Sequence, residues 1–331
     1  MRKAFAALIA VIGIALLAGA ASRVDGIKPF IAIVLPYGAL AILLIGLSWR
    51  MIRWSLSPVP FRIVTVCGQQ KSLPWIKAGW LESPYSTPGV IARMGLEVLM
   101  FRSLFRNTRS RLQEGPKLIY GEAKWLWLGA LAFHWSLLIV LLRHLRFLVE
   151  PVPKPALFLE SVDGFFQVGA PVLYATDIVM LAALLYLLQR RFREPQLRFI
   201  SLFTDYFALF LLLGIAISGV WMRYFARVDV VAVKQLALSL TILSPSLPKN
   251  LSPWFFAHLA LVSTLAAYLP FSKLMHMGGI FLSPTRNLAN NSRMKRHVNP
   301  WNYPVKVHTY EEWEDEFREK IEAAGLPVER R

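Results

Sequence analysis

Four histidines of the sequence lie in long apolar stretches, where a polar ring is costly. His134 and His144 share one stretch, ten positions apart, and His258 and His276 share another, eighteen positions apart. Both ring nitrogens of an imidazole in hydrocarbon have a polar partner when one binds a metal and the other makes a hydrogen bond. A single buried histidine commonly has a structural role, but two on each of two segments favour a ligand role. We therefore expect all four to bind metal.

The sequence contains one cysteine, Cys67. This excludes an internal disulfide, a CxxCH haem attachment, a cysteine-ligated iron–sulfur cluster and a cysteine-type zinc site. Four imidazoles instead match two iron porphyrins, each held between two histidines. The sequence thus predicts two bis-histidine haems, from which electrons leave the chain only through another subunit.

Helical geometry constrains how the histidines pair. At about 100° per residue, His258 and His276 point the same way, and His134 and His144 differ by about 80°. Along continuous helices, at about 1.5 Å per residue, His258 and His276 are about 27 Å apart, and His134 and His144 are about 15 Å apart. A kink at Pro270 and helix tilt would absorb the difference of about 12 Å.

Apolar runs dominate the chain. Its 331 residues are 56% hydrophobic with a mean hydropathy of +0.47, and several runs are long enough to cross a hydrocarbon core of about 30 Å. We expect an all-α membrane protein with kinks at Pro36 and Pro270. The first run would also suit a cleaved secretory signal, but we interpret it as an anchor helix. Six spans are predicted: 4–21, 30–49, 125–142, 169–188, 202–221 and 254 to about 282.

Basic residues indicate the orientation of these spans. The net charge of +17 would suit a nucleic-acid-binding protein, but 28 of the 37 lysines and arginines fall on one side of the spans. Because basic residues are retained on the cytoplasmic side, we expect both termini to lie in the cytoplasm. We interpret the positive charge as a sign of membrane orientation, so the expected partner is the lipid bilayer and not nucleic acid. His134 then pairs with His276 near the cytoplasm, and His144 with His258 near the outer face.

The spans divide the chain into four predicted parts. These are a two-helix membrane segment (1–50), a cytoplasmic and interfacial connection (51–122), a four-helix core that holds both haems (123–282) and a cytoplasmic tail (283–331).

Three stretches outside the spans have helical patterns. Residues 88–109 mix apolar residues with arginines, which favours a helix on the inner membrane face or against a partner. Residues 228–243 suit a short interfacial helix on the outer side. The tail run "YEEWEDEFREKIEAAG" predicts a helix that ends at its glycine. His297 and His308 lie in this tail and are expected to be solvated or to contact a partner.

Four further residues near the outer face are candidates for function. Asp177 is a candidate for quinone-linked proton transfer, with a stabilising hydrogen bond or ion pair as the alternative. Lys154 is a weaker candidate for contact with a quinone. Arg143 and Arg146 flank His144, and they would pair with haem propionates or extend to the membrane interface.

Several stretches carry a family resemblance. The pattern His134-x9-His144 followed by His258-x17-His276 resembles the ligands of the gamma subunits of respiratory nitrate reductases, which are helical quinol oxidases. A resemblance over nearly the whole chain is to the DsrM-type cytochrome b subunits of the membrane complex associated with dissimilatory sulfite reductase. It is carried by "YGEAKWLWLGALAFHWSLLIVLLRHLRF", "EPVPKPALFLESVDGFFQ" and "RHVNPWNYPVKVHTYEEWEDEFREKIEAAGLPVE".

The second resemblance implies a set of cofactors and partners. It implies two b-type haems and electron exchange between menaquinone and a cytoplasmic iron–sulfur subunit, DsrK, which is similar to heterodisulfide reductases. The electrons would pass to or from the sulfur carrier DsrC. Other implied partners are the periplasmic multihaem cytochrome DsrJ, the iron–sulfur protein DsrO and the membrane subunit DsrP, and the implied location is the bacterial cytoplasmic membrane.

Three alternatives remain open at this point. Within the redox class, the chain would be the gamma subunit of a nitrate reductase-like quinol oxidase. A second alternative is a proton-coupled transporter in which the histidines and Asp177 form a relay without haem, although the sequence has no repeated halves. The third is a structural anchor for redox subunits. The last two would be colourless, so one absorption spectrum separates them from a cytochrome.

Overall fold

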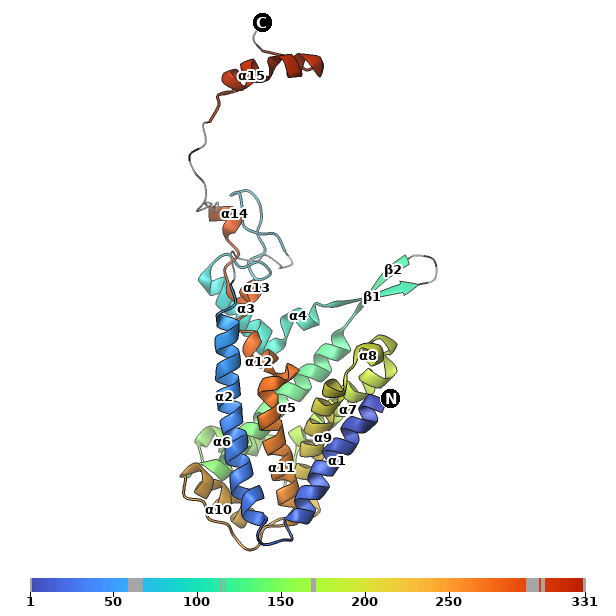
Figure 1. Ribbon diagram of the computed structural model, residues 1–331, viewed down its shortest axis with the longest axis vertical. Helices are drawn as coiled ribbons and strands as arrows, with labels where there is room; N and C mark the ends of the chain where they lie inside the picture. Colours follow the sequence, from blue (N-terminus) through green and yellow to red (C-terminus); the bar gives the residue numbers. More distant parts are fainter. Residues whose placement is uncertain are drawn as a thin grey trace.

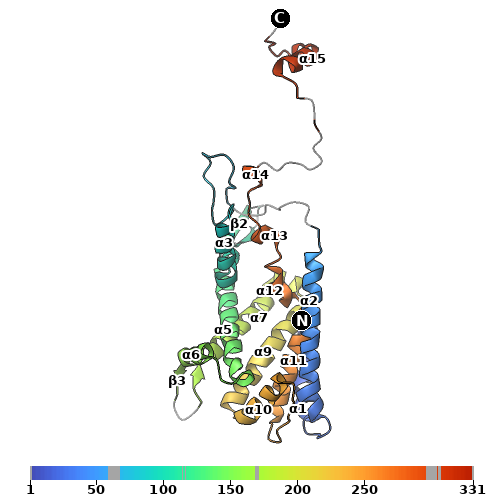
Figure 2. The ribbon, with the colours of Figure 1, turned by 90° about the vertical axis from the view of Figure 1, so that its left-hand side faces the viewer.

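The structure is a computed structural model that describes residues 2–58, 68–113, 115, 117–167, 171–295, 304 and 307–329. Cys67 and His297, which the sequence singled out, lie outside these residues. The described chain is predominantly helical, and its long helices run side by side as a bundle (Figures 1 and 2). This agrees with the predicted all-α membrane fold.

Five helical segments in the described part of the chain are long and apolar enough to cross a membrane. An α-helix of about 20 residues covers the roughly 30 Å of a hydrocarbon core, and each of the five approaches or exceeds that length. They are α1 (Arg2–Ala21), α2 (Leu35–Ser55, with the turn before it), α5 (Lys124–Leu148), α9 (Phe203–Tyr224) and α11 (Pro253–Tyr268, with the turn after it).

The remaining predicted span corresponds to α7 (Ala175–Arg193), which packs in the bundle against α5 and α9. It is not among the five because charged residues lie near both of its ends, Asp177 in the first turn and three arginines in the last. The predicted start at residue 169 lies outside the described residues, but the helix begins later than predicted, because residues 171–174 are not helical. The apolar run before the helix contains a short strand, β4 (Leu173–Tyr174), and hydropathy does not distinguish this strand from the first turn of a helix.

Both predicted proline positions coincide with a change in helical geometry, but the helix continues past Pro36 and ends near Pro270. A π-helical turn, η1 (Phe30–Val34), precedes α2, and Pro36 lies in the first turn of α2. Around Pro270 the expected single span to residue 282 was wrong, because α11 ends at Tyr268. The chain continues through two 3-10 turns, η2 (Leu269–Phe271) and η3 (Lys273–Met275), into the short helix α12 (His276–Gly279). Proline lacks the N–H that helix continuation requires.

Shorter elements gather at the two ends of the bundle (Figure 1). At one end lie α6 (Lys154–Asp163), β3 (Gly164–Phe166), which pairs with β4, and α10 (Val230–Thr241). At the other lie α3 (Thr87–Met100), α4 (Arg102–Phe105), α8 (Pro195–Ile200) and α13 (Pro284–Asn287). The short helices expected within 88–109 and 228–243 are therefore present. After α14 (Ser292–Lys295), the predicted tail helix is α15 (Tyr310–Ala323).

One hairpin was not predicted. Strands β1 (Thr108–Gln113) and β2 (Lys117–Glu122) pair antiparallel, with Gly115 between them at φ 73°. A positive φ favours glycine. The apolar run from Leu118 to Tyr120 has the composition of a strand, but it is too short to stand out beside the membrane spans.

The bundle is held by close packing of small and large residues. Ala4, Ala7 and Val11 of α1 form a core with Leu211 of α9 and Leu261 of α11. Between α5 and α7, Gly129 lies against the ring of Tyr186, and a Cβ on Gly129 would come within 2.6 Å of Cδ1 of that ring.

We expect Gly129→Ala to destabilise the bundle, because the added methyl forces α5 and α7 apart. Overpacking of this kind costs about 1–3 kcal/mol. Gly13→Ala on α1 is the matched control, since a Cβ there meets nothing within 4 Å. Thermal unfolding in detergent should show a lower midpoint for Gly129→Ala alone, and equal midpoints for the two variants would contradict this packing.

Candidate functional site

The structure brings His134 and His276 together. Their ring centroids lie 5.9 Å apart and the ring planes make an angle of 82°. Metal–imidazole bonds of about 2 Å on either side of one ion put the two centroids roughly 6 Å apart. The spacing therefore matches that of two rings that share an ion, and it also lies in the range of an edge-to-face ring contact. His134 lies in the first half of α5, and His276 begins α12 after the break in α11.

The other two histidines form a second pair toward the opposite end of the bundle. His144 lies near the end of α5 and His258 in the first half of α11, and the two rings are close enough to interact electrostatically. Among the described residues, no group of three or more histidine, cysteine, aspartate or glutamate side chains is placed to hold a metal ion. The four histidines thus form two separate pairs, which suits two axial ligands on each of two ions.

Backbone carbonyls hold three of the four rings in one tautomer. The Nδ1–H groups of His134, His144 and His276 donate to backbone carbonyls at 2.7, 2.7 and 3.0 Å. His258 Nδ1 lies 2.8 Å from Ser218 Oγ, which also lies 3.0 Å from the carbonyl of Ile215, and this nitrogen is a donor when the serine hydrogen points to that carbonyl. A donor at Nδ1 leaves an unprotonated lone pair at Nε2, the form that binds a metal. No hydrogen bond to these Nε2 atoms occurs among the described residues.

Aromatic rings border His134. Phe101 and Phe133 lie edge-on to it, with ring centroids at 4.9 and 5.0 Å. Phe101 follows α3 in a left-handed conformation with φ 50°. The indole N–H groups of Trp127 and Trp135 hold the end of α3 on α5 by donating to the carbonyls of Met100 and Leu99. Sequence reasoning missed Phe101, because His134, the residue that it contacts, lies 33 positions later in the chain.

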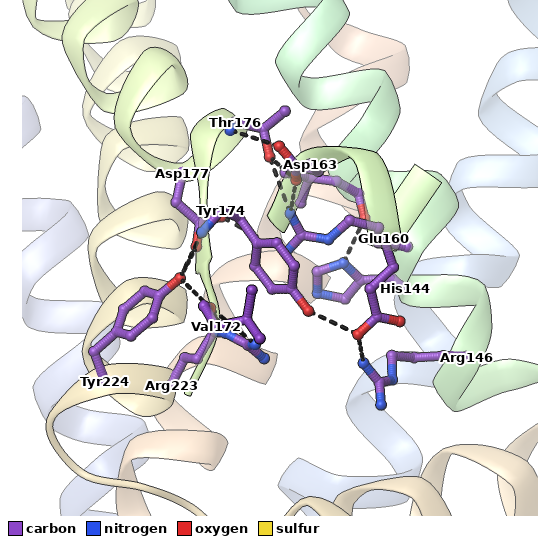
Figure 3. Close-up of polar contacts among 12 residues, drawn as sticks. His144, Arg146, Glu160, Asp163, Val172, Tyr174, Thr176, Asp177, Arg223 and Tyr224 are labelled. Carbon is purple, nitrogen blue, oxygen red and sulfur yellow. Dashed lines mark hydrogen bonds and ion pairs between the residues drawn. The ribbon is translucent and has the colours of Figure 1, made fainter. Parts of the chain in front are cut away.

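A buried charge network lies beside His144 (Figure 3). Arg143 makes an ion pair with Asp163 at the end of α6, and its guanidinium lies 3.7 Å from Asp177 on α7. Thr176 donates to Asp163 through both its backbone N–H and its hydroxyl, at 2.9 and 2.6 Å. The Arg143 guanidinium also lies over the Tyr174 ring, 3.4 Å from the centroid. One side chain of α5 is thereby tied to α6, β4 and α7.

Asp177 has a second partner in this network. Tyr224 at the end of α9 donates its hydroxyl to Asp177 at 2.8 Å. The carboxylate therefore has both a hydrogen bond and an ion pair, as the stabilising alternative for this residue requires. Lys154, the other quinone candidate, begins α6 with an exposed side chain, and no contact among the described residues joins it to Asp177.

Arg146 also contacts a carboxylate of α6. It pairs with Glu160, which in turn accepts a hydrogen bond from the Tyr174 hydroxyl at 2.7 Å. Burial, followed by this hydrogen bond, raises the pKa of the Tyr174 phenol, so it remains a donor at neutral pH. In this structure the two arginines considered for haem propionates thus face Asp163 and Glu160. Sequence reasoning did not connect these partners, which lie 20 and 14 positions away.

Two further residues do not contact the histidine rings directly. His308 in the tail has its Nδ1 3.6 Å from a carboxylate oxygen of Glu316, in keeping with a solvated side chain. Asp205 on α9 is buried and accepts a hydrogen bond from Lys273 at 2.8 Å.

Comparison with known proteins agrees with this arrangement. Residues 118–296 match the model of the nitrate reductase gamma subunit family. A relative in Archaeoglobus fulgidus, an Hdr-like menaquinol oxidoreductase cytochrome b-like subunit, is 45% identical over 276 residues, which cover 81% of this chain and 82% of the relative. A protein of the same description in Archaeoglobus profundus is 41% identical over 279 residues, covering 82% of each chain.

The family and the apolar helices together make the chain a multi-pass membrane protein. The match begins within β2 and ends after α14, so it contains all four histidines, whereas α1 and α2 precede it. The chain belongs to the nitrate reductase gamma subunit family.

Proposed function

We propose that the chain is the dihaem b-type cytochrome subunit of a quinone-linked membrane redox complex. The observation that carries this proposal is the arrangement of the four imidazoles as two pairs. His134, His144 and His276 donate from Nδ1 and keep a lone pair on Nε2, and His258 has Ser218 beside its Nδ1. The family match and the cytochrome b-like description of the relatives support it.

The donor set fits two haems. His134 and His276 would hold one iron, and His144 and His258 the other. Bound haem supplies one-electron redox chemistry with a potential set by its axial ligands and their hydrogen bonds. The protein fixes the ring orientation through the acceptors at Nδ1. Arg143 and Arg146 already pair with Asp163 and Glu160. To bind haem propionates, each arginine would have to leave its carboxylate or pair with both groups.

The two pairs lie toward opposite ends of the bundle, which supports electron transfer across a membrane. The positive-inside bias favours the end with α3, α4 and α8 as the cytoplasmic one, with both termini on that side of the cytoplasmic membrane. Residues 123–282 would then form the haem core, 1–50 a membrane segment, and 51–122 and 283–331 the cytoplasmic parts.

The relatives' description as Hdr-like menaquinol oxidoreductase subunits supports menaquinol as the quinone partner. With one cysteine, the chain cannot bind an iron–sulfur cluster through cysteines alone, so a cytoplasmic iron–sulfur subunit must continue the path. We propose a DsrK-like, heterodisulfide-reductase-like subunit for this role, with DsrC beyond it and DsrJ, DsrO and DsrP as further members. Asp177, and with less support Lys154, would take part in proton exchange with the quinone.

The experiment is anaerobic reduction of the purified chain by a water-soluble menaquinol analogue. We expect reduced-minus-oxidised absorption bands of haem b that grow with the analogue. Bands that appear with dithionite but not with menaquinol would contradict the quinone role. A colourless protein would contradict the cytochrome and leave the transporter or anchor alternatives.

Ser218→Ala should raise the midpoint potential of the outer haem, the one that His144 and His258 would hold. In the proposed site, with iron on Nε2, the Nδ1–H of His258 donates to Ser218 Oγ, 2.8 Å away, and losing this acceptor makes the imidazole a poorer donor to ferric iron. A tenfold change in relative affinity corresponds to about 59 mV for one electron, so we expect an upward shift of roughly 50 mV in a redox titration. Ser55→Ala on α2, where the hydroxyl bonds only within its own helix, should leave both potentials unchanged. An unshifted potential in Ser218→Ala would mean that this hydrogen bond does not tune the site.

A further inference from the structure

The break after α11 determines where His276 lies. On a continuous helix, His276 would follow His258 by eighteen positions and lie about 27 Å beyond it. Instead, the two 3-10 turns and the extended residue Ser272, at φ −107° and ψ 176°, redirect the chain. The ring of His276 then reaches its place 5.9 Å from His134. The break must therefore be held firmly for the pair to have a defined geometry.

Helix α2 contacts the broken segment along one face. Gly46, Arg50 and Trp54 are spaced four residues apart and so share that face. Arg50 Nη1 donates to the carbonyl of Pro270 at 2.6 Å, which satisfies an acceptor at the end of a helix. We call these three residues of α2 the supporting face.

Packing along the supporting face is close on both sides of His276. A Cβ on Gly46 would lie 2.7 and 2.9 Å from Cβ and Cγ of Pro270, and the Trp54 ring lies 3.5 Å from the Cβ position of Gly279. A proline ring cannot rotate away, so only glycine allows α2 to approach the break this closely. The chain is thus held six residues before the histidine and three residues after it.

A second contact fixes the carbonyl that orients the ring. The Nδ1–H of His276 donates to the carbonyl of Lys273 at 3.0 Å, and the Lys273 ammonium is held by the buried Asp205 of α9 at 2.8 Å. The supporting face and Asp205 therefore position the backbone from both sides, and neither contacts the Nε2 side of the ring.

We propose that the supporting face of α2 positions His276. A helix outside the family-matching segment then sets the geometry of the inner haem, the one that His134 and His276 would hold. Residues 35–55 lie before the matching segment, which begins at residue 118. The inference rests on the proposed haem ligation. It gives the N-terminal membrane segment a role in ligand geometry beyond anchoring, through Gly46, Arg50 and Trp54.

The test compares matched variants of the full chain purified with its complex. Gly46→Ala is paired with Gly38→Ala on the same helix, where a Cβ meets nothing within 4 Å. Arg50→Gln is paired with Arg50→Lys, which keeps a cationic donor for Pro270. The readouts are low-temperature EPR of the oxidised haems, potentiometric titration and haem per chain. The inner haem is identified as the one lost in His276→Ala.

We expect Gly46→Ala and Arg50→Gln to shift the EPR signal and potential of the inner haem only, or to lower the haem ratio from two toward one. Gly38→Ala and Arg50→Lys should stay close to wild type. Unchanged signals in both test variants would overturn the inference, as would equal loss of both haems, which indicates a general loss of stability. A wild-type chain without haem would instead overturn the proposed function and this inference with it.

Discussion

Replacing His276 by alanine should leave a chain with one haem instead of two. In the proposed cytochrome the variant removes one axial ligand from the inner pair, and His134 alone, through a single imidazole, does not retain a low-spin bis-histidine haem. The outer pair keeps both His144 and His258. Because His276 is exposed and begins a four-residue helix, its loss should not unfold the bundle. Electron transfer to the cytoplasmic partner should stop, while the outer haem remains reducible.

The measurement for His276→Ala is haem per chain, with the EPR spectrum of the remaining haem. His308→Ala is the matched control, because that histidine lies in the tail beside Glu316 and should not affect pigment. Two haems with wild-type spectra in His276→Ala would show that the residue is not a ligand.

Asp163→Ala should cause the largest loss of stability. It leaves the more distant Asp177 as the one carboxylate partner of the buried Arg143 guanidinium among the described residues, and it removes the acceptor of both Thr176 hydrogen bonds. Breaking a buried ion pair by removing one partner costs about 3–5 kcal/mol. With roughly 2 °C per kcal/mol in a protein of this size, the apparent unfolding midpoint should fall by about 5–10 °C.

Two control variants show whether the expected loss of stability comes from leaving a buried charge unpaired. Asp25→Ala removes an ion pair with Lys28 in which the aspartate side chain is 92% exposed, and exposed pairs contribute about 0–1 kcal/mol. The double variant Asp163→Ala with Arg143→Met should recover much of the loss, because no buried charge remains unpaired. If Asp163→Ala unfolded at the same temperature as Asp25→Ala, the network would not be a stabilising one.

Local sequence patterns were sufficient to predict the main helices. Each bundle helix has an apolar run near the membrane length, and that length requirement is independent of tertiary context. The order of the inner pair also followed from span direction, since spans alternate and His134 and His276 fall at the same end. The boundaries of α7 did not follow, because the apolar residues of β4 extend its hydropathy run.

The features that the sequence could not reveal depend on long-range contacts. Proline at position 270 indicated a kink, but the return of His276 toward His134 requires Arg50 and Gly46, more than 200 positions earlier in the chain. The partner of Arg143 was hidden for the same reason, because Asp163 lies on another helix. Composition shows that charged residues are present in a membrane segment, but only the fold shows which of them neutralise one another.

The most direct measurement is a pyridine haemochrome assay on the purified wild-type chain, with haem counted against protein. Ligation of iron by the two histidine pairs, as proposed, predicts a b-type spectrum and two haems per chain. A preparation that folds as a helical membrane protein but contains no haem b would contradict the assignment of the four imidazoles as iron ligands.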